Sequence, residues 1–345
     1  MSGEEEETKT DYHSRDFDWE TLKQQIERNP SYQYHLLPFT SQQQQQQEEQ
    51  KRENTQLEEN EEERESEDSK AWKNFHLRHS SGKFFKERRY LLKEFPELVS
   101  CTKFSKVLEV GCGNGSSVIP ILRGNKTIIV YACDCSEKTL ERAKEIVDAA
   151  NISRFEHQFQ PFCCDFTFTG FLKWLLCDSC QTDCHQKQQQ KYSDVKESGA
   201  ADGEGLRSSK EGSCCIGRVD FVTLIFTLSA VPLKRMPKAI GECFSVLRPG
   251  GLLLFRDYAS LTLGLYDMTM LRFESEQRVG FREYMRADGT RSYFFCLDTV
   301  RDLFVAAGFI ELELAYCCIN STNRRKGKSM LRVWVHGKFQ KPIPM

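Results

Sequence analysis

Short apolar runs alternate with longer stretches of helical spacing along most of the chain after residue 105. We predict strands at seven apolar runs: 106–110, 127–132, 155–162, 219–226, 252–256, 309–317 and 330–339. Apolar residues at helical spacing predict helices up to 122 and at 137–149, 170–176, 234–247 and 298–307. Strands that alternate with helices form a mostly parallel sheet covered on both faces. We therefore expect a doubly wound α/β domain of seven strands that ends in an antiparallel hairpin.

Residues at the ends of the predicted elements fit these boundaries. Ser136 precedes the helix at 137–149 and is a favourable N-cap, because its side-chain oxygen can accept a backbone N–H. Gly308 follows the last helix, where a glycine commonly terminates the helix. Pro96 is expected to end the helical segment before it, because proline lacks a backbone donor.

Two regions do not follow the alternating pattern. Residues 1–69 are acidic and glutamine-rich, and such a segment buries too little apolar surface to offset its ordering entropy. We expect a disordered tail, in which the more aromatic segment 17–39 is either a docking segment or disordered as well. Residues 177–217 are rich in Gln, Lys, Ser and Gly, and they predict a low-complexity surface insertion before the fourth strand.

Charge separates the tail from the rest of the chain. The net charge is −2 overall, but residues 1–70 carry −12 and residues 71–345 carry +10. A basic domain favours a polyanionic partner such as nucleic acid. The alternative is an ordinary solvated surface, and charge by itself leaves both open.

The 15 cysteines are scattered without a regular framework, and no apolar run has the length of a signal segment or a membrane span. We expect free thiols in a reducing compartment, namely the cytosol with the nucleus as the alternative, and no membrane association. The cluster Cys177, Cys180, Cys184 and His185 does not have the spacing of paired zinc knuckles, so we assign no metal.

The strongest local motif is Glu-Val-Gly-Cys-Gly-Asn-Gly, residues 109–115, which joins the first strand to a helix. Glycines at 111, 113 and 115 allow a tight turn against which a ligand can lie. A dinucleotide-binding fingerprint that starts at Gly111 would require glycine at 116, where Ser116 stands. The spacing resembles that of S-adenosylmethionine (SAM) methyltransferases with a Rossmann-like fold. An ordinary glycine turn is the alternative.

Acidic residues follow the next strands at positions that suit this cofactor. Asp134 comes after the second strand, where a carboxylate can accept hydrogen bonds from ribose hydroxyls. Asp165 comes after the third strand, where this fold usually accepts the adenine amino group. The fourth strand ends in Thr-Leu-Ser-Ala-Val-Pro, residues 227–232, and not in the Asn/Asp-Pro-Pro-Tyr/Phe typical of enzymes that methylate exocyclic amines of bases.

Two segments combine aromatic and basic residues. Residues 70–99 and 266–295 suit base stacking together with phosphate contact. The alternatives are a helix whose aromatic side chains pack on the domain, for the first segment, and a solvated hairpin, for the second. Composition leaves both alternatives open.

Taken together, these motifs resemble the methyltransferase-like family that forms 3-methylcytidine in the anticodon loop of transfer RNA. The resemblance covers residues 70–345 without the insertion. Its most specific parts are Arg-Asp-Tyr at 256–258, Tyr-Asp-Met-Thr-Met-Leu-Arg-Phe at 266–273 and Arg-Ala-Asp-Gly-Thr-Arg-Ser-Tyr-Phe-Phe at 286–295.

The resemblance implies a SAM-dependent tRNA methyltransferase with a Rossmann-like fold. It implies cofactor contacts from Trp72, His76, Gly111, Gly113, Asp134, Asp165 and Ile225. It implies substrate contacts from a clamping element and from arginines: Phe84, Phe85, Lys86, Arg88, Arg272, Arg286, Arg291 and Arg324. Members of the family can require a protein partner such as an aminoacyl-tRNA synthetase or another adaptor, and the tail segment is a candidate docking site.

The chain departs from the family pattern in three places. His76 stands where the family usually has tyrosine. Extra residues lengthen the stretch between Arg256 and Met268, near the expected substrate entrance, and the insertion at 177–217 exceeds the usual loop.

N3 of an unpaired cytosine has an exposed lone pair, so methylation there needs extraction and alignment of the base more than a general base. We assign Asp257 and Tyr258, after the fifth strand, as candidate catalytic residues that orient the base or face the cationic product. The alternative is that they only fix the turn. Two other functions stay open: a methyltransferase for proteins or small molecules, and a non-catalytic RNA-binding module.

Overall fold

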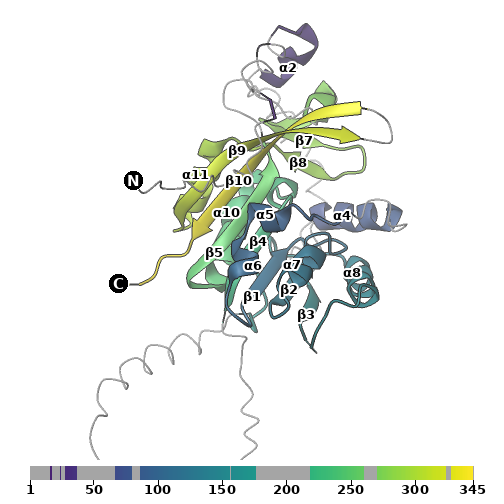
Figure 1. Ribbon diagram of the computed structural model, residues 1–345. Coiled ribbons are helices and arrows are strands. Elements are labelled where there is room, and N and C mark those ends of the chain that lie inside the picture. The colour runs from purple at the N-terminus through teal and green to yellow at the C-terminus, as the bar shows by residue number, and fades with distance from the viewer. Residues whose placement is uncertain are drawn as a thin grey trace, which may run out of the picture.

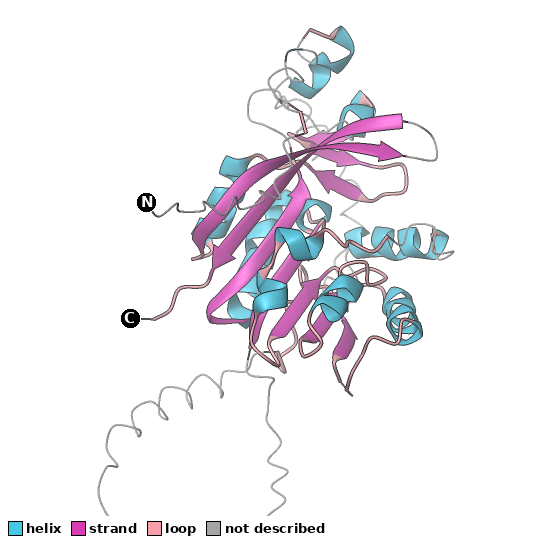
Figure 2. Cartoon of the chain, viewed as in Figure 1, coloured by secondary structure: helices cyan, strands magenta, loops and turns pink. Residues whose placement is uncertain are grey.

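A computed structural model describes residues 16–17, 24, 28–36, 67–79, 86–155, 157–175, 218–259, 270–323 and 328–344. A seven-stranded sheet organises this part of the chain (Figures 1 and 2). The strands are β1 (Lys106–Val110), β2 (Ile129–Asp134), β3 (Phe159–Cys163), β4 (Val219–Ile225), β5 (Leu247–Tyr258), β9 (Ile310–Asn323) and β10 (Lys328–Gln340).

The strand order is β3-β2-β1-β4-β5-β10-β9. The five strands from β3 to β5 are parallel, whereas β10 runs antiparallel to both β5 and β9. The order reverses between β1 and β4, and ligands bind at such a switch point, beyond the carboxyl ends of the strands. The predicted fold class, including the antiparallel terminal hairpin, is confirmed.

Helices cover both faces because the parallel strands alternate their apolar side chains. Val107 points to one face and packs with residues of α5 (Leu91–Glu94), α6 (Glu97–Ser100), α7 (Val118–Gly124) and α8 (Glu137–Ala149). Leu108 and Val110 point to the other face and join the core of α10 (Met236–Val246) and α11 (Leu297–Ala306). Figure 1 shows α5, α6 and α7 on the near face of the sheet.

A second sheet of three short strands lies beside the carboxyl ends of the main strands. It has the order β6-β7-β8, with β6 (Arg278–Gly280), β7 (Glu283–Met285) and β8 (Arg291–Tyr293), and we call residues 278–293 the small sheet. The helix α4 (Glu67–Arg78) lies between the small sheet and α8 in Figure 1. The short 3₁₀ helices are η2 (Leu228–Ala230), η3 (Leu233–Arg235), η4 (Met270–Arg272) and η5 (Ser275–Gln277).

Part of the predicted tail packs on the small sheet. Residues 30–36 form η1 (Pro30–Tyr32) and α2 (Gln33–Leu36). The Tyr34 hydroxyl donates to the Phe273 carbonyl, and His35 Nδ1 lies 2.8 Å from the Tyr284 hydroxyl in a buried hydrogen bond. The helix α4 begins at Glu67, three residues before the predicted start of the element at residue 70.

Several predicted details are wrong. The helix expected at 170–176 is a turn over the described residues 172–175, closed by the Leu175 N–H to the Leu172 carbonyl. Ser136 is the N-cap residue of α8, as predicted, but the expected side-chain cap hydrogen bond is not formed, and the side chain accepts the Thr139 hydroxyl instead. The strand expected at 155–162 starts later, at Phe159. The fifth strand is longer than 252–256, because Leu247 already pairs with Val219 of β4 before a register shift and the pairing with β10 continues to Tyr258.

Other boundaries agree with the sequence. The bounds of β1 and α8 are those predicted, and Gly308 follows α11 with φ +95°, a conformation that favours glycine. Pro96 separates α5 from α6. No helix within the described ranges is long and apolar enough to cross a membrane. The insertion at 177–217 lies outside the described residues.

Candidate active site

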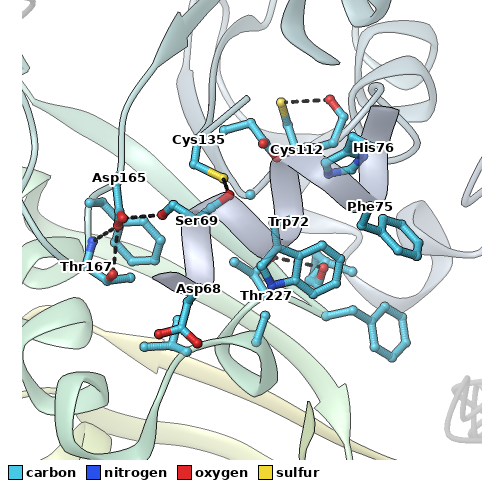
Figure 3. A pocket seen from close by; sticks show the side chains of 18 of the residues that line it. Asp68, Ser69, Trp72, Phe75, His76, Cys112, Cys135, Asp165, Thr167 and Thr227 are labelled. Carbon is cyan, nitrogen blue, oxygen red and sulfur yellow. Dashed lines mark hydrogen bonds between the residues drawn. The ribbon is translucent and has the colours of Figure 1, made fainter. Parts of the chain in front are cut away.

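A cavity of about 410 Å³ opens at the switch point between β1 and β4. The glycine loop after β1 forms one wall, the ends of β2, β3 and β4 contribute others, and α4 covers it (Figure 3). Volumes of this order hold cofactors and drug-sized ligands. Nine of the predicted site residues line this one cavity: Trp72, His76, Arg88, Gly111, Gly113, Asp134, Asp165, Ile225 and Tyr258.

The glycine loop needs glycine for two separate reasons. Gly111, Gly113 and Gly115 have φ of +66°, +53° and +87°, in the left-handed region that strains other residues. A Cβ on Gly111 would also lie 2.5 Å from Thr227 Cγ2. The Thr227 hydroxyl donates to the Val110 carbonyl at 2.9 Å, which fixes that side chain against the loop. The loop therefore brings bare backbone to the cavity wall.

Two carboxylates face the cavity from neighbouring strand ends. Asp134 accepts the Gly113 N–H at 3.0 Å on one oxygen and the Ser136 N–H at 3.1 Å on the other. Because each oxygen keeps further acceptor capacity, Asp134 can also accept ligand hydroxyls. Asp165 accepts the Thr167 N–H and hydroxyl on one oxygen and the Ser69 hydroxyl on the other (Figure 3).

The helix α4 presents an aromatic face to the cavity. The Trp72 and Phe75 rings meet edge to face with centroids 5.3 Å apart, and His76 lies beside both. Trp72 Nε1 is buried without a hydrogen-bond partner among the described residues, as expected for a donor that a polar ligand atom satisfies. Burial lowers the pKa of His76, against the charge of Asp134, so this side chain is neutral at pH 7.

Aromatic and cationic groups stand together at the end of β4. Phe226 has φ +57°, which is unusual for a bulky residue and marks a constrained position. The centroid of its ring lies 5.1 Å from the centroid of the Tyr258 ring and 5.4 Å from the guanidinium carbon of Arg88. Arg88 also donates to Ser117 Oγ at 2.7 Å, which fastens the predicted clamping element to the start of α7, just after the glycine loop.

Asp257, a predicted catalytic residue, precedes Tyr258 at the end of β5 and is fully buried. Its carboxylate accepts the Ser229 N–H at 2.9 Å and the Tyr258 N–H at 2.8 Å. Burial raises the pKa of Asp257 to about 6, against the lowering effect of these hydrogen bonds. The geometry supports the alternative given above for this residue, in which its carboxylate fixes the turn and places Tyr258.

The predicted substrate-binding residues divide into three groups. Lys86 is exposed, and so is Arg272 on η4. Arg286 and Arg291 hold the small sheet together: Arg286 donates to Thr290 Oγ1, and Arg291 lies 2.8 Å from a Glu283 carboxylate oxygen. Phe84, Phe85 and Arg324 lie outside the described residues, so their roles remain predictions, as does phosphate binding by the described arginines.

Sequence reasoning missed other residues that line the cavity, among them Ser69, Phe226 and Thr227. Thr227 and Phe226 follow a buried parallel strand, a place where ligand contacts are common, so their position was a usable signal. Ser69 lies in a stretch that reads as a polar tail, and nothing local marks it. Within the described ranges, no group of three or more His, Cys, Asp and Glu residues is placed to hold a metal ion.

The donors and the shape of this cavity fit SAM. The glycine loop offers bare backbone to the cofactor, and the carboxylate after β2 can accept its ribose hydroxyls. The carboxylate after β3 and the apolar Ile225 complete the match to SAM. Trp72 adds the unpartnered N–H described above. Fold and site together define a SAM-dependent methyltransferase.

Comparisons with known proteins agree that the chain is a methyltransferase and indicate the group to which it belongs. Residues 84–313 match the model of a methyltransferase domain family. The tRNA N(3)-cytidine methyltransferase METTL6 of Homo sapiens is 33% identical over 282 residues, which cover 81% of this chain and 82% of that protein. The tRNA N(3)-methylcytidine methyltransferase Mettl2 of Drosophila melanogaster is 32% identical, over 81% of this chain and 73% of that protein. O-methyltransferase 3 of Dictyostelium discoideum is also 32% identical, over 81% of this chain and 53% of that protein.

The chain therefore belongs to the methyltransferase family, in the group of the tRNA N(3)-cytidine methyltransferases. The resemblance inferred from the sequence motifs is confirmed.

Proposed function

We propose that this protein transfers the methyl group of SAM to N3 of a cytidine in the anticodon loop of tRNA. The observation that carries the proposal is the complete cofactor cavity in a chain that is 33% identical to METTL6 over 81% of its length. When bound, SAM supplies an electrophilic methyl group, and the cytosine N3 lone pair forms the new N–C bond as the S–C bond breaks.

The side chains at the cavity divide the remaining work between them. Asp134 and Asp165 orient the cofactor, and α4 excludes water from above it with Trp72 and Phe75. The rings of Phe226 and Tyr258 offer a stacking surface for an extracted base. Arg88 lies over the Phe226 ring, where its charge favours an approaching phosphate. No general base is needed, because N3 carries no proton when the base is neutral.

The second part of this proposal concerns a protein partner. We propose that a synthetase or another adaptor protein docks on the segment 17–39. The Tyr34 carbonyl accepts Arg278 of the small sheet and His35 contacts Tyr284, whereas Pro30 and Ser31 are exposed and remain available to such a partner.

The test is methyl transfer from labelled SAM to unmodified total tRNA, followed by nucleoside analysis. The wild type should form 3-methylcytidine, and Asp134→Ala should weaken SAM binding by about 10- to 100-fold, because hydrogen bonds to a charged acceptor are lost. The same assay with protein and small-molecule acceptors tests the activity suggested by the name O-methyltransferase 3. SAM binding with label only in those acceptors would overturn the tRNA assignment.

A further inference from the structure

The helix α4 contacts both the cofactor cavity and the small sheet. Trp72 and His76 line the cofactor cavity, and the Ser69 hydroxyl donates to the Asp165 carboxylate. The opposite contacts reach the small sheet: Arg78 donates to the Asp288 carbonyl at 3.3 Å. Ala71 Cβ also lies 3.4 Å from the place where a Cβ on Gly289 would stand. The helix therefore lies between the cofactor cavity and the small sheet. Figure 1 shows α4 beside β8.

Asp68 is the charged centre of this contact. Its carboxylate lies 3.4 Å from Arg291 Nε on β8 and 3.8 Å from an Arg235 nitrogen on η3. Arg291 in turn lies 2.8 Å from a Glu283 oxygen on β7. Charges of alternating sign thus run from the main domain through α4 into the small sheet.

These charges are largely shielded from solvent. The Asp68 and Arg291 side chains are 20% and 15% exposed. A pair of this kind is screened less by water and salt than an exposed one, and the loss of one partner leaves the other poorly compensated. The pair can therefore transmit a displacement of α4 to β8.

We propose that Asp68 is a positioning residue that couples occupation of the cofactor cavity to the placement of the small sheet. A cofactor in contact with Trp72 and His76 restrains α4, and the restrained helix holds Asp68 where Arg291 meets it. Linkage makes the effect reciprocal, so a substrate that orders the small sheet strengthens cofactor binding. The meaning of the coupling for tRNA rests on the proposed function, but the coupling itself can be measured without RNA.

The test is hydrogen–deuterium exchange on the full chain with and without S-adenosylhomocysteine. In the wild type, the ligand should slow exchange at residues 283–293 by about fivefold or more. Asp68 itself lines the cavity, so wild type and variant are compared at saturating ligand. Asp68→Asn should then keep the ligand-induced protection in the glycine loop and β2 and lose most of the protection in the small sheet. Glu67→Gln is the matched control, because it removes an equal charge from the neighbouring exposed position of the same helix turn.

Further variants separate positioning from a general loss of structure. Arg291→Gln removes the other end of the pair and should reproduce the effect, the double variant should be no worse than either single one, and Asp68→Glu should restore much of the protection. Two results would overturn the coupling. One is hydrogen exchange in the small sheet of the wild type that does not change when the ligand binds. The other is ligand-induced protection of the small sheet that persists in both Asp68→Asn and Arg291→Gln. Coupling without methylation of any tRNA would instead defeat the proposed function alone.

Discussion

At the scale of single residues, Gly111 shows how one position sets the shape of the cofactor cavity. Its backbone has φ +66°, and an added Cβ would meet Thr227 Cγ2 at 2.5 Å and Oγ1 at 2.7 Å. Both Thr227 atoms belong to a branched side chain held by a hydrogen bond to Val110. The loop has no easy way to accommodate a side chain here.

Gly111→Ala should therefore cost about 2–4 kcal/mol of unfolding free energy, from left-handed strain and overpacking, and should weaken SAM binding. Denaturant unfolding and calorimetric SAM titration measure the two effects. Gly241→Ala is the control, because Gly241 lies inside α10 with nothing within 4 Å of its added Cβ. That variant should gain about 0.5–1 kcal/mol. Equal behaviour of the two variants would contradict the steric account.

Glu109 gives the stability of the protein a dependence on pH. It is fully buried on β1, and burial raises its pKa to about 7, although the Thr223 hydroxyl donates to it and favours the charged form. The folded state therefore binds a proton that the unfolded state has released, between the unfolded pKa of about 4.3 and pH 7. Stability from this group is full below that range and is lost as pH rises through it.

The measurement is the unfolding free energy of the wild type minus that of Glu109→Gln, followed from pH 4 to pH 8. The difference should fall by on the order of 3 kcal/mol as pH rises, because the amide does not titrate. A difference that is constant or rises with pH would show that Glu109 is not held protonated in the folded state.

At the scale of elements, a buried ion pair fastens α5 to the sheet. Glu94 on α5 lies 2.5 Å from Arg256 on β5, both side chains are 0% exposed, and His336 Nδ1 on β10 lies 3.0 Å from the same carboxylate. The Arg256 guanidinium carbon stacks 4.1 Å from the Trp334 ring centroid. Burial acts to raise the pKa of Glu94, but the charge of Arg256, helped by His336, outweighs it and lowers the pKa.

Glu94→Gln should destabilise the protein by about 3–5 kcal/mol, because it leaves the Arg256 charge buried without compensation. Glu97→Gln is a close comparison on the next helix, where Glu97 is 30% exposed and pairs with Lys338 at 2.7 Å. That more exposed pair should contribute about 1 kcal/mol or less. Chemical denaturation of both variants decides the matter, and similar losses would count against a special role for the buried pair.

The element scale also shows which parts of the fold the sequence could predict. Local patterns place β1 and α8 at the bounds that they have, and Pro96 and Gly308 at element ends. The same reasoning starts β5 too late, at residue 252, because the apolar run begins there, whereas Leu247 already pairs with Val219 of β4 before a register shift. Tertiary pairing decides strand length there, and the local sequence carries no sign of it.

At the scale of the whole molecule, the sequence predicts the site residues that follow strands and misses those that depend on contacts between distant segments. The glycine loop, Asp134 and Asp165 were predictable because they follow strands whose carboxyl ends must meet at one edge of a parallel sheet. Asp68 and Arg291 are 223 positions apart, and no local pattern links a polar tail residue to a hairpin arginine. Asp257 was assigned from its position after β5, which does not reveal that its carboxylate is fully buried outside the cavity, where it accepts the Ser229 and Tyr258 N–H groups.

The central claim concerns the atom that receives the methyl group. The most direct measurement supplies trideuteromethyl SAM and unmodified tRNA to the full chain, digests the RNA, and locates the label by mass spectrometry of the fragments and their nucleosides. The account predicts deuterated 3-methylcytidine in the anticodon-loop fragment, in strongly reduced amount with Asp134→Ala at limiting SAM. Label at another cytidine atom, such as the exocyclic N4 or C5, or in a fragment outside that loop, would contradict it.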